Sequence, residues 1–228
     1  MPEIVPREMR ALLVERYEDD LSAAIAGLKA VVRSIPGLSR GQVLVKVEAA
    51  PCNPSDLLLL QGRYGKLKTL PSVPGWEGAG KVVATGGGWL ARWLLGQRVA
   101  CGLQEDRDGT WAEYFVARAD ECIPLKRQLP IDQGASLIVN PLTAMGLLDT
   151  AKRDGHHAAV QTAAASQLGR MVRAMAQRSG YPIIHLVRRD AQVELLGSMG
   201  ASPVLKSSDE EFPEQLRLAG AQLGATAV

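Results

Sequence analysis

Cysteine and histidine are scarce in this sequence, which has three of each among its 228 residues. The cysteines, Cys52, Cys101 and Cys122, are odd in number and lack the paired spacing of a zinc or redox site. A disulfide-stapled secreted fold is therefore excluded, and the reducing cytoplasm is the expected compartment. No His or Lys lies near Cys52 in sequence, so we expect it to be a small buried hydrophobic side chain rather than a nucleophile.

The chain also lacks a strong charge of either sign and any long apolar run. Its formal net charge is +2 and its pI is about 8.5, so no field that would recruit nucleic acid or a membrane surface is predicted. No apolar stretch approaches the ~20 residues of a transmembrane helix. Residues 1–10 carry four charges and no apolar segment of the kind found in signal peptides. We expect a small-molecule ligand, with no nucleic-acid and no membrane partner.

The first half of the chain has short runs rich in Val, Leu and Ala, separated by Gly, Pro and charged residues. Such runs predict β-strands, and here they cover residues 11–15, 42–49, 80–85, 97–102 and 112–117. Several short strands in succession indicate a barrel-like domain. Trp89 and Trp93, four residues apart among leucines, predict a short helix that packs on that barrel rather than a platform for a ligand.

Near Asp132 the pattern changes from strand to helix. A first helix is predicted over residues 132–139, followed by a second that Asn140 would cap, with Pro141 at its first position, and that runs to Ala151. The predicted domains are therefore residues 1–130, a barrel, and residues 131–228, an α/β domain.

Residues 158–190 have the pattern of a βαβ unit, with strands over residues 158–162 and 183–187 and a helix over residues 168–178. A dinucleotide fold has G-x-G-x-x-G at the first turn, and the three glycine positions here hold Ala164, Ser166 and Gly169. Small residues let the backbone approach a diphosphate, which would lie at the helix N-terminus beside Leu168. The competing interpretation is an ordinary α/β unit with a tight turn.

The end of the second strand indicates which dinucleotide is preferred. An NAD site usually has Asp or Glu about 20 residues beyond the glycine turn, to bind the ribose 2′-hydroxyl. Arg188 and Arg189 stand in that place, and arginine suits the 2′-phosphate of NADP. The alternative is a pair of solvated arginines at a strand end. We predict NADP as the cofactor.

Five segments in order resemble the medium-chain dehydrogenase/reductase family. They are Asn53-Pro-Ser-Asp56, Gln61-Gly-Arg-Tyr-Gly65, Pro74-Gly-Trp-Glu-Gly78, Gly96-Gln-Arg-Val99 and Asn140-Pro-Leu-Thr143. The resemblance implies an N-terminal GroES-like barrel followed by a Rossmann domain, a doubly wound parallel sheet. Within the family, the first two segments are similar to the zinc-free quinone oxidoreductases and 2-enoyl thioester reductases.

The resemblance also implies that no metal is bound. Alcohol dehydrogenases of this family hold catalytic zinc through a Cys and a His at the positions of Asn53 and Trp76. An indole cannot ligate zinc, and an amide is a poor substitute for a thiolate. Glu77 remains, but one carboxylate does not make a site.

By the same resemblance, Tyr64 is the candidate proton donor and Asn53 a second catalytic candidate, while Asn140 and Thr143 line the nicotinamide side. Each has a structural alternative. Tyr64 could be a surface loop residue, Asn53 a helix cap, and Asn140 and Thr143 residues that cap a helix or pack on its face. Capping is the preferred interpretation for Asn53. The implied activity is hydride transfer from NADPH to a quinone or another activated C=C or carbonyl substrate, without zinc.

Two other functions stay open at this point. One is a 2-enoyl thioester reductase, for which Arg63, Lys66 and Lys68 would supply a basic channel mouth unless they are solvated loop charges. The other is a non-catalytic nucleotide-binding protein or an incomplete fragment.

The C-terminal region predicts only half of a dinucleotide fold. A helix over residues 191–199, a strand over residues 203–205, a helix over residues 210–220 capped by Ser208, and the opening of a fourth strand at residues 225–228 complete the sequence. The strand over residues 158–162 would then be an edge strand or be covered only by that last stub, and we expect little turnover from the 228 residues alone. Family members often pair as homodimers, an arrangement open to a full-length protein.

Overall fold

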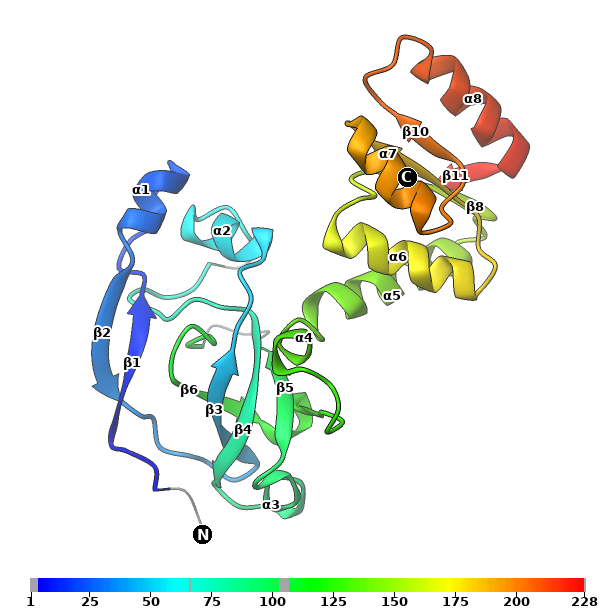
Figure 1. Ribbon diagram of the computed structural model, residues 1–228. Coiled ribbons are helices and arrows are strands. Elements are labelled where there is room, and N and C mark those ends of the chain that lie inside the picture. Colours follow the sequence, from blue (N-terminus) through cyan, green and yellow to red (C-terminus); the bar gives the residue numbers. More distant parts are fainter. Residues whose placement is uncertain (1–3, 66, 103–106, 228) are drawn as a thin grey trace. The chain divides into compact units, whose positions relative to one another are not determined.

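The computed structural model describes residues 4–65, 67–102 and 107–227 (Figure 1). The chain divides into two compact units, Met1–Val139 and Asn140–Val228, and this division falls nine residues beyond the boundary expected from the sequence. Each unit has a sheet of its own, antiparallel in the first and parallel in the second.

Unit 1 contains a five-stranded antiparallel sheet and a separate antiparallel pair. The order in the large sheet is β6 (Tyr114–Arg118), β3 (Gln42–Ala49), β4 (Glu77–Thr85), β5 (Arg98–Gly102) and β7 (Ile123–Pro124). The pair is β1 (Glu8–Leu13) with β2 (Lys29–Ser34). Short helices lie between the strands: α1 (Leu21–Ala26), α2 (Pro54–Leu60), α3 (Trp89–Leu94), the 3-10 turn η1 (Ala119–Glu121) and α4 (Ile131–Ala135).

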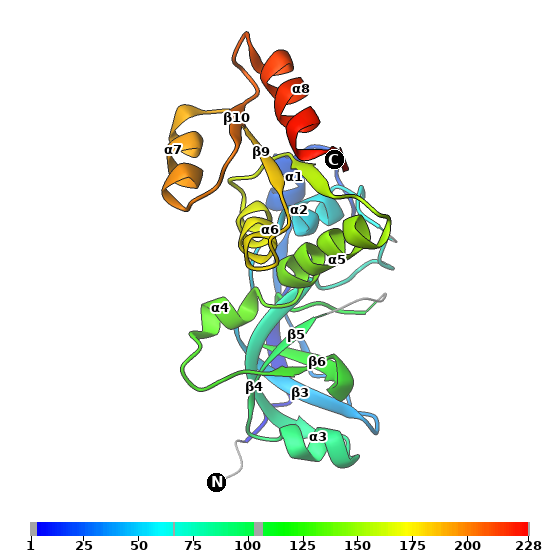
Figure 2. The same ribbon diagram turned by 90° about the vertical axis from the view of Figure 1, so that its right-hand side faces the viewer.

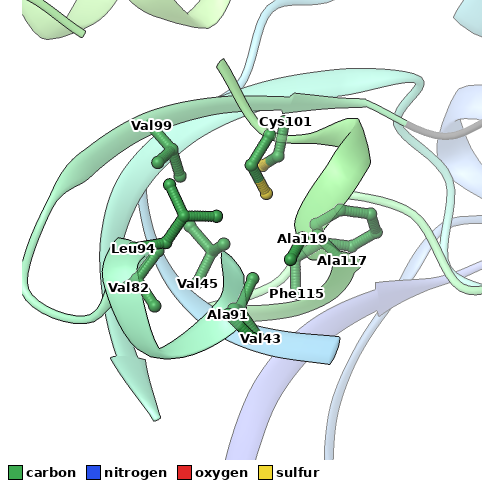
Figure 3. Close-up of a cluster of buried hydrophobic side chains, with 11 residues drawn as sticks. Val43, Val45, Val82, Ala91, Leu94, Val99, Cys101, Phe115, Ala117 and Ala119 are labelled. Carbon is green, nitrogen blue, oxygen red and sulfur yellow. The ribbon is translucent and has the colours of Figure 1, made fainter. Parts of the chain in front are cut away.

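The core of unit 1 follows from strand alternation. Val43 and Val45 of β3 point into one apolar cluster together with Val82, Val99 and other small side chains (Figure 3). Each Val or Leu buried in this way stabilises the fold by about 1.5–3 kcal/mol. Strands β3 and β4 approach so closely that a side chain at Gly80 would collide with the backbone carbonyl of Lys46.

Helix α3 lies in the connection between β4 and β5 (Figure 2), where the sequence predicts a helix. Its buried residues are Ala91 and Leu94, which point into the cluster of Figure 3. The predicted short helix therefore packs on the barrel through these two residues, while Trp89 is 82% exposed and Trp93 57% exposed. The small and aliphatic side chains fill the closely packed barrel end.

Unit 2 is a four-stranded parallel sheet in the order β10-β9-β8-β11. The strands are β8 (Ala158–Gln161), β9 (Ile183–Val187), β10 (Val204–Lys206) and β11 (Ala225–Ala227), and the helices are α5 (Val139–Arg153), α6 (Gln167–Arg178), α7 (Asp190–Ser198) and α8 (Phe212–Leu223). In chain order the sheet reads 3-2-1-4, which is the order of a partial Rossmann fold. As predicted, β8 is covered on its far side by the short β11.

Two capping predictions are wrong. Helix α5 begins at Val139, so Asn140 lies within its first turn and is not its cap. Helix α8 begins at Phe212 with Glu211 at the cap position, because Pro213 fits the first turn of a helix and sets the start there. Ser208 instead donates from Oγ to the backbone oxygen of Arg188 at 3.3 Å.

Candidate functional site

The turn between β8 and α6 has the local structure expected of a diphosphate-binding turn. Ser166 is the N-cap of α6, and its Oγ accepts the N–H of Gly169 at 3.0 Å. The first turn of a helix leaves N–H groups without intrahelical partners. In the described part of the chain, no hydrogen bond engages the N–H groups of Gln167 and Leu168, so both are available to an anion at the positive end of α6.

Gly169 is required because the turn packs closely against the start of α6. A Cβ at this position would lie 2.5 Å from the Ala164 backbone oxygen and 2.8 Å from that of Ala163. Both oxygens belong to the turn itself. The glycine therefore lets the turn fold back against the start of α6, and Ala163 takes the positive φ of 48° that this path demands.

Two of the predicted cofactor residues have side chains that point into the protein. Ala164 is fully buried and packs with Val187 and Leu196. Leu168 packs against the cluster formed by α5, α6 and β9. Contact of either residue with a cofactor would be made through the backbone.

A cleft of about 790 Å³ opens beside this turn, at the carboxyl ends of β8 and β9. In parallel α/β sheets, ligands bind at this edge. Ser166, Arg188 and Arg189 of the predicted set line the cleft, together with Thr162, Ala163, Ala165, Leu186, Val187, Gln192 and Ser207.

Two arginines give the cleft a positive charge. Arg188 and Arg189 are exposed, and within the described ranges neither forms an ion pair. The neighbouring carboxylate, Asp190, is held by Lys206, with Nζ to Oδ1 at 2.6 Å. That hydrogen bond holds the pKa of Asp190 below its usual value. The acidic residue that could oppose a phosphate is therefore already paired.

Sequence reasoning missed Gln192 and Ser207. Gln192 Oε1 accepts the backbone N–H groups of Arg188 and Arg189, at 3.1 and 3.2 Å, and so fixes the turn that presents both guanidinium groups. Ser207 follows β10 and donates from Oγ to the Val187 oxygen at 3.2 Å. The spacing of Gln192 in the first turn of α7 was a readable signal, whereas the position of Ser207 depends on the pairing of β10 with β9.

Unit 1 has a second polar cluster, buried at the N-terminus of α2. Asn53 is the N-cap of α2, as predicted, and its backbone N–H donates to Asp56 Oδ2 at 2.8 Å. Its side chain is 6% exposed and donates from Nδ2 to Glu77 Oε1 at 2.9 Å. The remaining Asp56 oxygen, Oδ1, accepts the backbone N–H of Trp76 at 3.0 Å. A fully buried carboxyl is costly to ionise, and burial raises the pKa of Asp56 to about 6.

The side chains around Trp76 form the edge of this cluster. The Tyr64 ring lies 5.6 Å from the Trp76 ring, centroid to centroid, in a tilted arrangement. Lys68 Nζ lies 5.2 Å from the Trp76 ring centroid and donates to the backbone oxygens of Val73 and Arg107. Tyr64 is 40% exposed, so its ring contacts Trp76 and remains partly open to solvent.

The residues at the positions where alcohol dehydrogenases of the resembled family bind zinc do not form a metal site. Their side-chain groups are the Asn53 amide, the Trp76 indole and the Glu77 carboxyl group, and the amide is already bound to the carboxyl. Among the described residues no group of three or more His, Cys, Asp or Glu is placed to hold an ion. The prediction that Cys52 is buried is wrong. The residue is exposed, and desolvation together with the nearby Asp56 raises its thiol pKa, so its nucleophilicity at neutral pH is weakened.

The predicted site residues therefore fall into two groups. Asn53 and Tyr64 belong to unit 1, and Ser166, Arg188 and Arg189 gather at the cleft of unit 2. Asn140, half-buried, and Thr143, exposed, lie in the first turns of α5. In the portion of the chain that the structure describes, no helix has the length and apolar character of a membrane span.

Known proteins resemble the chain in both sequence and structure. The family model of the alcohol dehydrogenase GroES-like domain matches residues 39–127. A Mesorhizobium loti protein proposed to be an NADPH:quinone reductase is 37% identical with a TM-score of 0.87, over 98% of this chain and 67% of that one. The quinone oxidoreductase from Thermus thermophilus, also solved as its NADPH complex, is 25% identical with a TM-score of 0.76, over 93% of this chain and 64% of that one.

Curated relatives are similar to a comparable degree. Mitochondrial enoyl-[acyl-carrier-protein] reductase from Bos taurus is 32% identical over 218 residues, which are 92% of this chain and 56% of that enzyme. The Caenorhabditis elegans enzyme is 33% identical over 210 residues, 89% of this chain and 58% of that protein. The chain thus spans little more than half the length of these relatives. The chain has a GroES-like barrel and a partial Rossmann sheet, and it is 37% identical to a solved relative of which it covers two thirds. It therefore belongs to the medium-chain dehydrogenase/reductase family.

Proposed function

We propose that the protein is a zinc-free, NADPH-dependent oxidoreductase that reduces a quinone or another activated C=C or carbonyl compound. The observation that carries the proposal is the cleft of unit 2, lined by two guanidinium groups that have no ion-pair partner among the described residues. They follow the second strand of the sheet, where the adenosine ribose is expected. The NADPH complex of the Thermus thermophilus relative supports the same cofactor.

The residues of the cleft fit the phosphates of NADPH. The small side chains of Ala163, Ala165 and Ser166 leave the N-terminus of α6 open to a diphosphate. Arg188 and Arg189 provide planar, always charged donors for a 2′-phosphate, and the Ser207 hydroxyl stands beside them. A 2′-hydroxyl would leave both charges unused, so NADH should bind more weakly.

Bound NADPH supplies the hydride, and the protein must stabilise the negative charge that develops on the acceptor oxygen. A positioned O–H or N–H donor does this without a metal. Tyr64 is the proposed donor, because its ring is supported by Trp76 while its exposed part can reach a ligand. Asn53 is committed to capping α2 and to Glu77, so its proposed part is to hold the loop before α2 in place. Asn140 and Thr143 are proposed to line the nicotinamide.

An enoyl thioester is the second candidate substrate, supported by the similarity to the mitochondrial reductases. The basic residues foreseen for its channel mouth weaken this alternative. Arg63 pairs with Asp19 at 3.1 Å, and Lys68 is buried and donates to backbone oxygens. Lys66 lies outside the described residues. A quinone or enone therefore remains the preferred acceptor class.

Calorimetric titration of the 228-residue chain with NADPH and with NADH tests the cofactor assignment. Binding of NADPH about tenfold or more tightly than NADH is expected, from charge-assisted hydrogen bonds to the 2′-phosphate. Equal affinity would refute the assignment of the arginines, and heat from neither nucleotide would remove the enzyme assignment.

NADPH oxidation with a quinone, an enone and an enoyl thioester then tests the reaction. Turnover that falls about 100-fold in Tyr64→Phe, with NADPH affinity unchanged, is the result expected for a general acid. NADPH binding with no turnover on any acceptor, also when the chain is extended to the length of its relatives, would favour a nucleotide-binding protein without catalysis.

A further inference from the structure

Glu77 is a buried carboxyl group shared between two distant segments of the chain. It is the first residue of β4 and is 1% exposed. Its Oε1 accepts the Asn53 side-chain Nδ2 at 2.9 Å, and its Oε2 accepts the backbone N–H groups of Ile138 at 2.9 Å and Val139 at 2.8 Å. All three donors are N–H groups, an arrangement that suits a carboxylate, which accepts only.

The contact with Ile138 and Val139 is a helix cap supplied from another element. Helix α5 begins at Val139, and the N–H groups at a helix start need acceptors from outside the helix. Capping residues are usually Ser, Thr, Asp or Asn immediately before the helix, but Ile138 offers no side-chain acceptor. Glu77 supplies the missing oxygen, and its charge lies at the favourable end of the helix dipole.

The Asn53 side chain binds the other oxygen of the Glu77 carboxyl group, Oε1. The Asn53 backbone is held by Asp56, whose second oxygen holds the backbone of Trp76, the neighbour of Glu77 in sequence. The Asn53 side chain is held by Glu77 itself. Asn53 and the start of α5 are therefore fixed by opposite oxygens of one group, and a movement of either segment changes the position of the acceptor that the other uses.

We propose that Glu77 is a positioning residue that couples the start of α5 to the loop of Asn53. The chain passes from unit 1 to unit 2 directly after Val139, so the amides that Glu77 binds are the last two of unit 1. The same helix carries Asn140 and Thr143, and the consequence for catalysis rests on the function proposed above. The capping itself does not depend on that function.

A purely stabilising role would not require this arrangement. Burying a carboxylate carries a large desolvation cost, which an apolar side chain at the start of β4 would avoid. The cost is offset here by donors drawn from two segments, separated from Glu77 by 24 and 61 residues.

Amide hydrogen exchange of the 228-residue chain tests the capping directly and needs no turnover. Three variants are compared with the wild type: Glu77→Gln, Glu77→Ala and, as control, Glu113→Gln, which alters an exposed carboxyl that accepts the Arg10 N–H at 2.8 Å. Exchange at Ile138 and Val139 should accelerate about tenfold in Glu77→Ala and about threefold in Glu77→Gln, which keeps one acceptor oxygen. The control should leave both amides unchanged.

Kinetics separate positioning from simple destabilisation. Assayed well below its melting temperature, Glu77→Gln should lower the kcat of the 228-residue chain, small as it is expected to be, about tenfold, while the Kd of NADPH stays within about twofold. The same substitution in an Asn53→Ala background should add much less than it does alone, since the coupled contact is already lost. A variant that melts earlier but keeps wild-type kcat and wild-type exchange at Ile138 and Val139 would overturn the proposal.

Failure of the proposed function would look different. If the wild type reduces no acceptor, the enzyme assignment falls, yet the exchange experiment still decides whether Glu77 caps α5. Should Glu77→Ala not fold, Glu77→Gln carries the test on its own, and unaltered exchange at both amides in that variant refutes the capping.

Discussion

The polar cluster of unit 1 and the cleft of unit 2 differ in the burial and the hydrogen bonding of their charged groups. Around Asn53 the carboxyl groups of Asp56 and Glu77 are buried, and N–H donors of the chain itself occupy both oxygens of each. At the cleft, Arg188 and Arg189 are exposed and have no carboxylate partner in the described ranges. The first arrangement is complete without a ligand, whereas the second lacks a counter-charge. The buried, fully hydrogen-bonded cluster is suited to fixing the local structure, whereas the exposed arginines are suited to binding an anionic ligand.

The largest effect expected from this contrast is on cofactor affinity. Replacing Arg188 and Arg189 together by Ala should weaken NADPH binding about 100-fold, because each charge-assisted hydrogen bond to a phosphate contributes roughly 1.5–3 kcal/mol before solvent screening. NADH affinity should change by less than about threefold, since its ribose has no phosphate to lose. Calorimetric titrations of both nucleotides measure this. Arg178→Ala, an exposed arginine at the other end of α6, is the matched control and should change neither affinity.

The buried cluster should show itself in the pH dependence of stability. The folded-state pKa of Asp56 is raised to about 6 from 3.8, so the folded protein keeps a proton that the unfolded chain releases between these values. The contribution of Asp56 to stability is therefore complete below about pH 4 and is lost as the pH rises to about 6, a difference on the order of 3 kcal/mol.

Urea unfolding of the wild type and of Asp56→Asn at several pH values between 4 and 7 measures that difference. As the pH rises from 4 to 7, the free energy of unfolding of the wild type should fall relative to that of the variant, whatever the difference between the two proteins is at pH 4. Parallel curves would mean that Asp56 is ionised in the folded protein at low pH, and that the cluster is less dry than its burial indicates.

A smaller effect is expected from the turn that leads to the cleft. Gly169→Ala places a methyl group 2.5 Å from the Ala164 backbone oxygen, so the turn must shift at a cost of about 1–3 kcal/mol. NADPH affinity should fall together with the melting temperature. Gly146→Ala in α5 serves as the control, because its new methyl group meets nothing within 4 Å and a helical glycine is itself unfavourable. That variant should be as stable as the wild type or more so.

The smallest effects are expected at Ser166, where two substitutions distinguish its role in capping α6 from its proposed role in binding a diphosphate. Loss of the cap in Ser166→Ala should reduce the free energy of unfolding by about 1 kcal/mol. Ser166→Asp keeps a capping oxygen and should retain stability, yet its negative charge would oppose a diphosphate at the start of α6. Thermal melts with parallel NADPH titrations test both variants. Equal NADPH affinity in wild type and Ser166→Asp would place the diphosphate elsewhere.

Local patterns explain why so much of unit 2 could be predicted. The strand over residues 183–187 has the predicted bounds, and the helix before it starts one residue earlier than expected, because apolar periodicity and the Gly180–Pro182 break act over short distances. The order of the sheet followed from the fold's usual topology. The helix starts were less certain. Asn140 has every property of a cap, but Glu77, from another element, satisfies the first amides of α5 and moves the start to Val139.

Contacts between distant segments account for what the sequence could not show. Glu77 was set aside as a lone carboxylate, since nothing local indicates that its donors come from Asn53 and Ile138. Strand β2 was missed for a different reason. Its apolar run, from Ala30 to Val32, is only three residues long, and its positions are exposed or half-buried. Cys52 appeared apolar by its neighbours in sequence, and its exposure depends on the path of the loop before α2.

The ion pair between Lys206 and Asp190 has a consequence for how coenzyme choice could change over time. Lys206 does not line the cleft, yet it withholds the one carboxylate that stands next to the two arginines. Exchanging this lysine for a neutral residue would release that carboxylate and lower the local positive potential, with every arginine still in place. Under the proposed function, discrimination between the two nicotinamide coenzymes is thus adjustable from a neighbouring strand, and an evolving lineage could change it without substituting the residues proposed to hold the nucleotide.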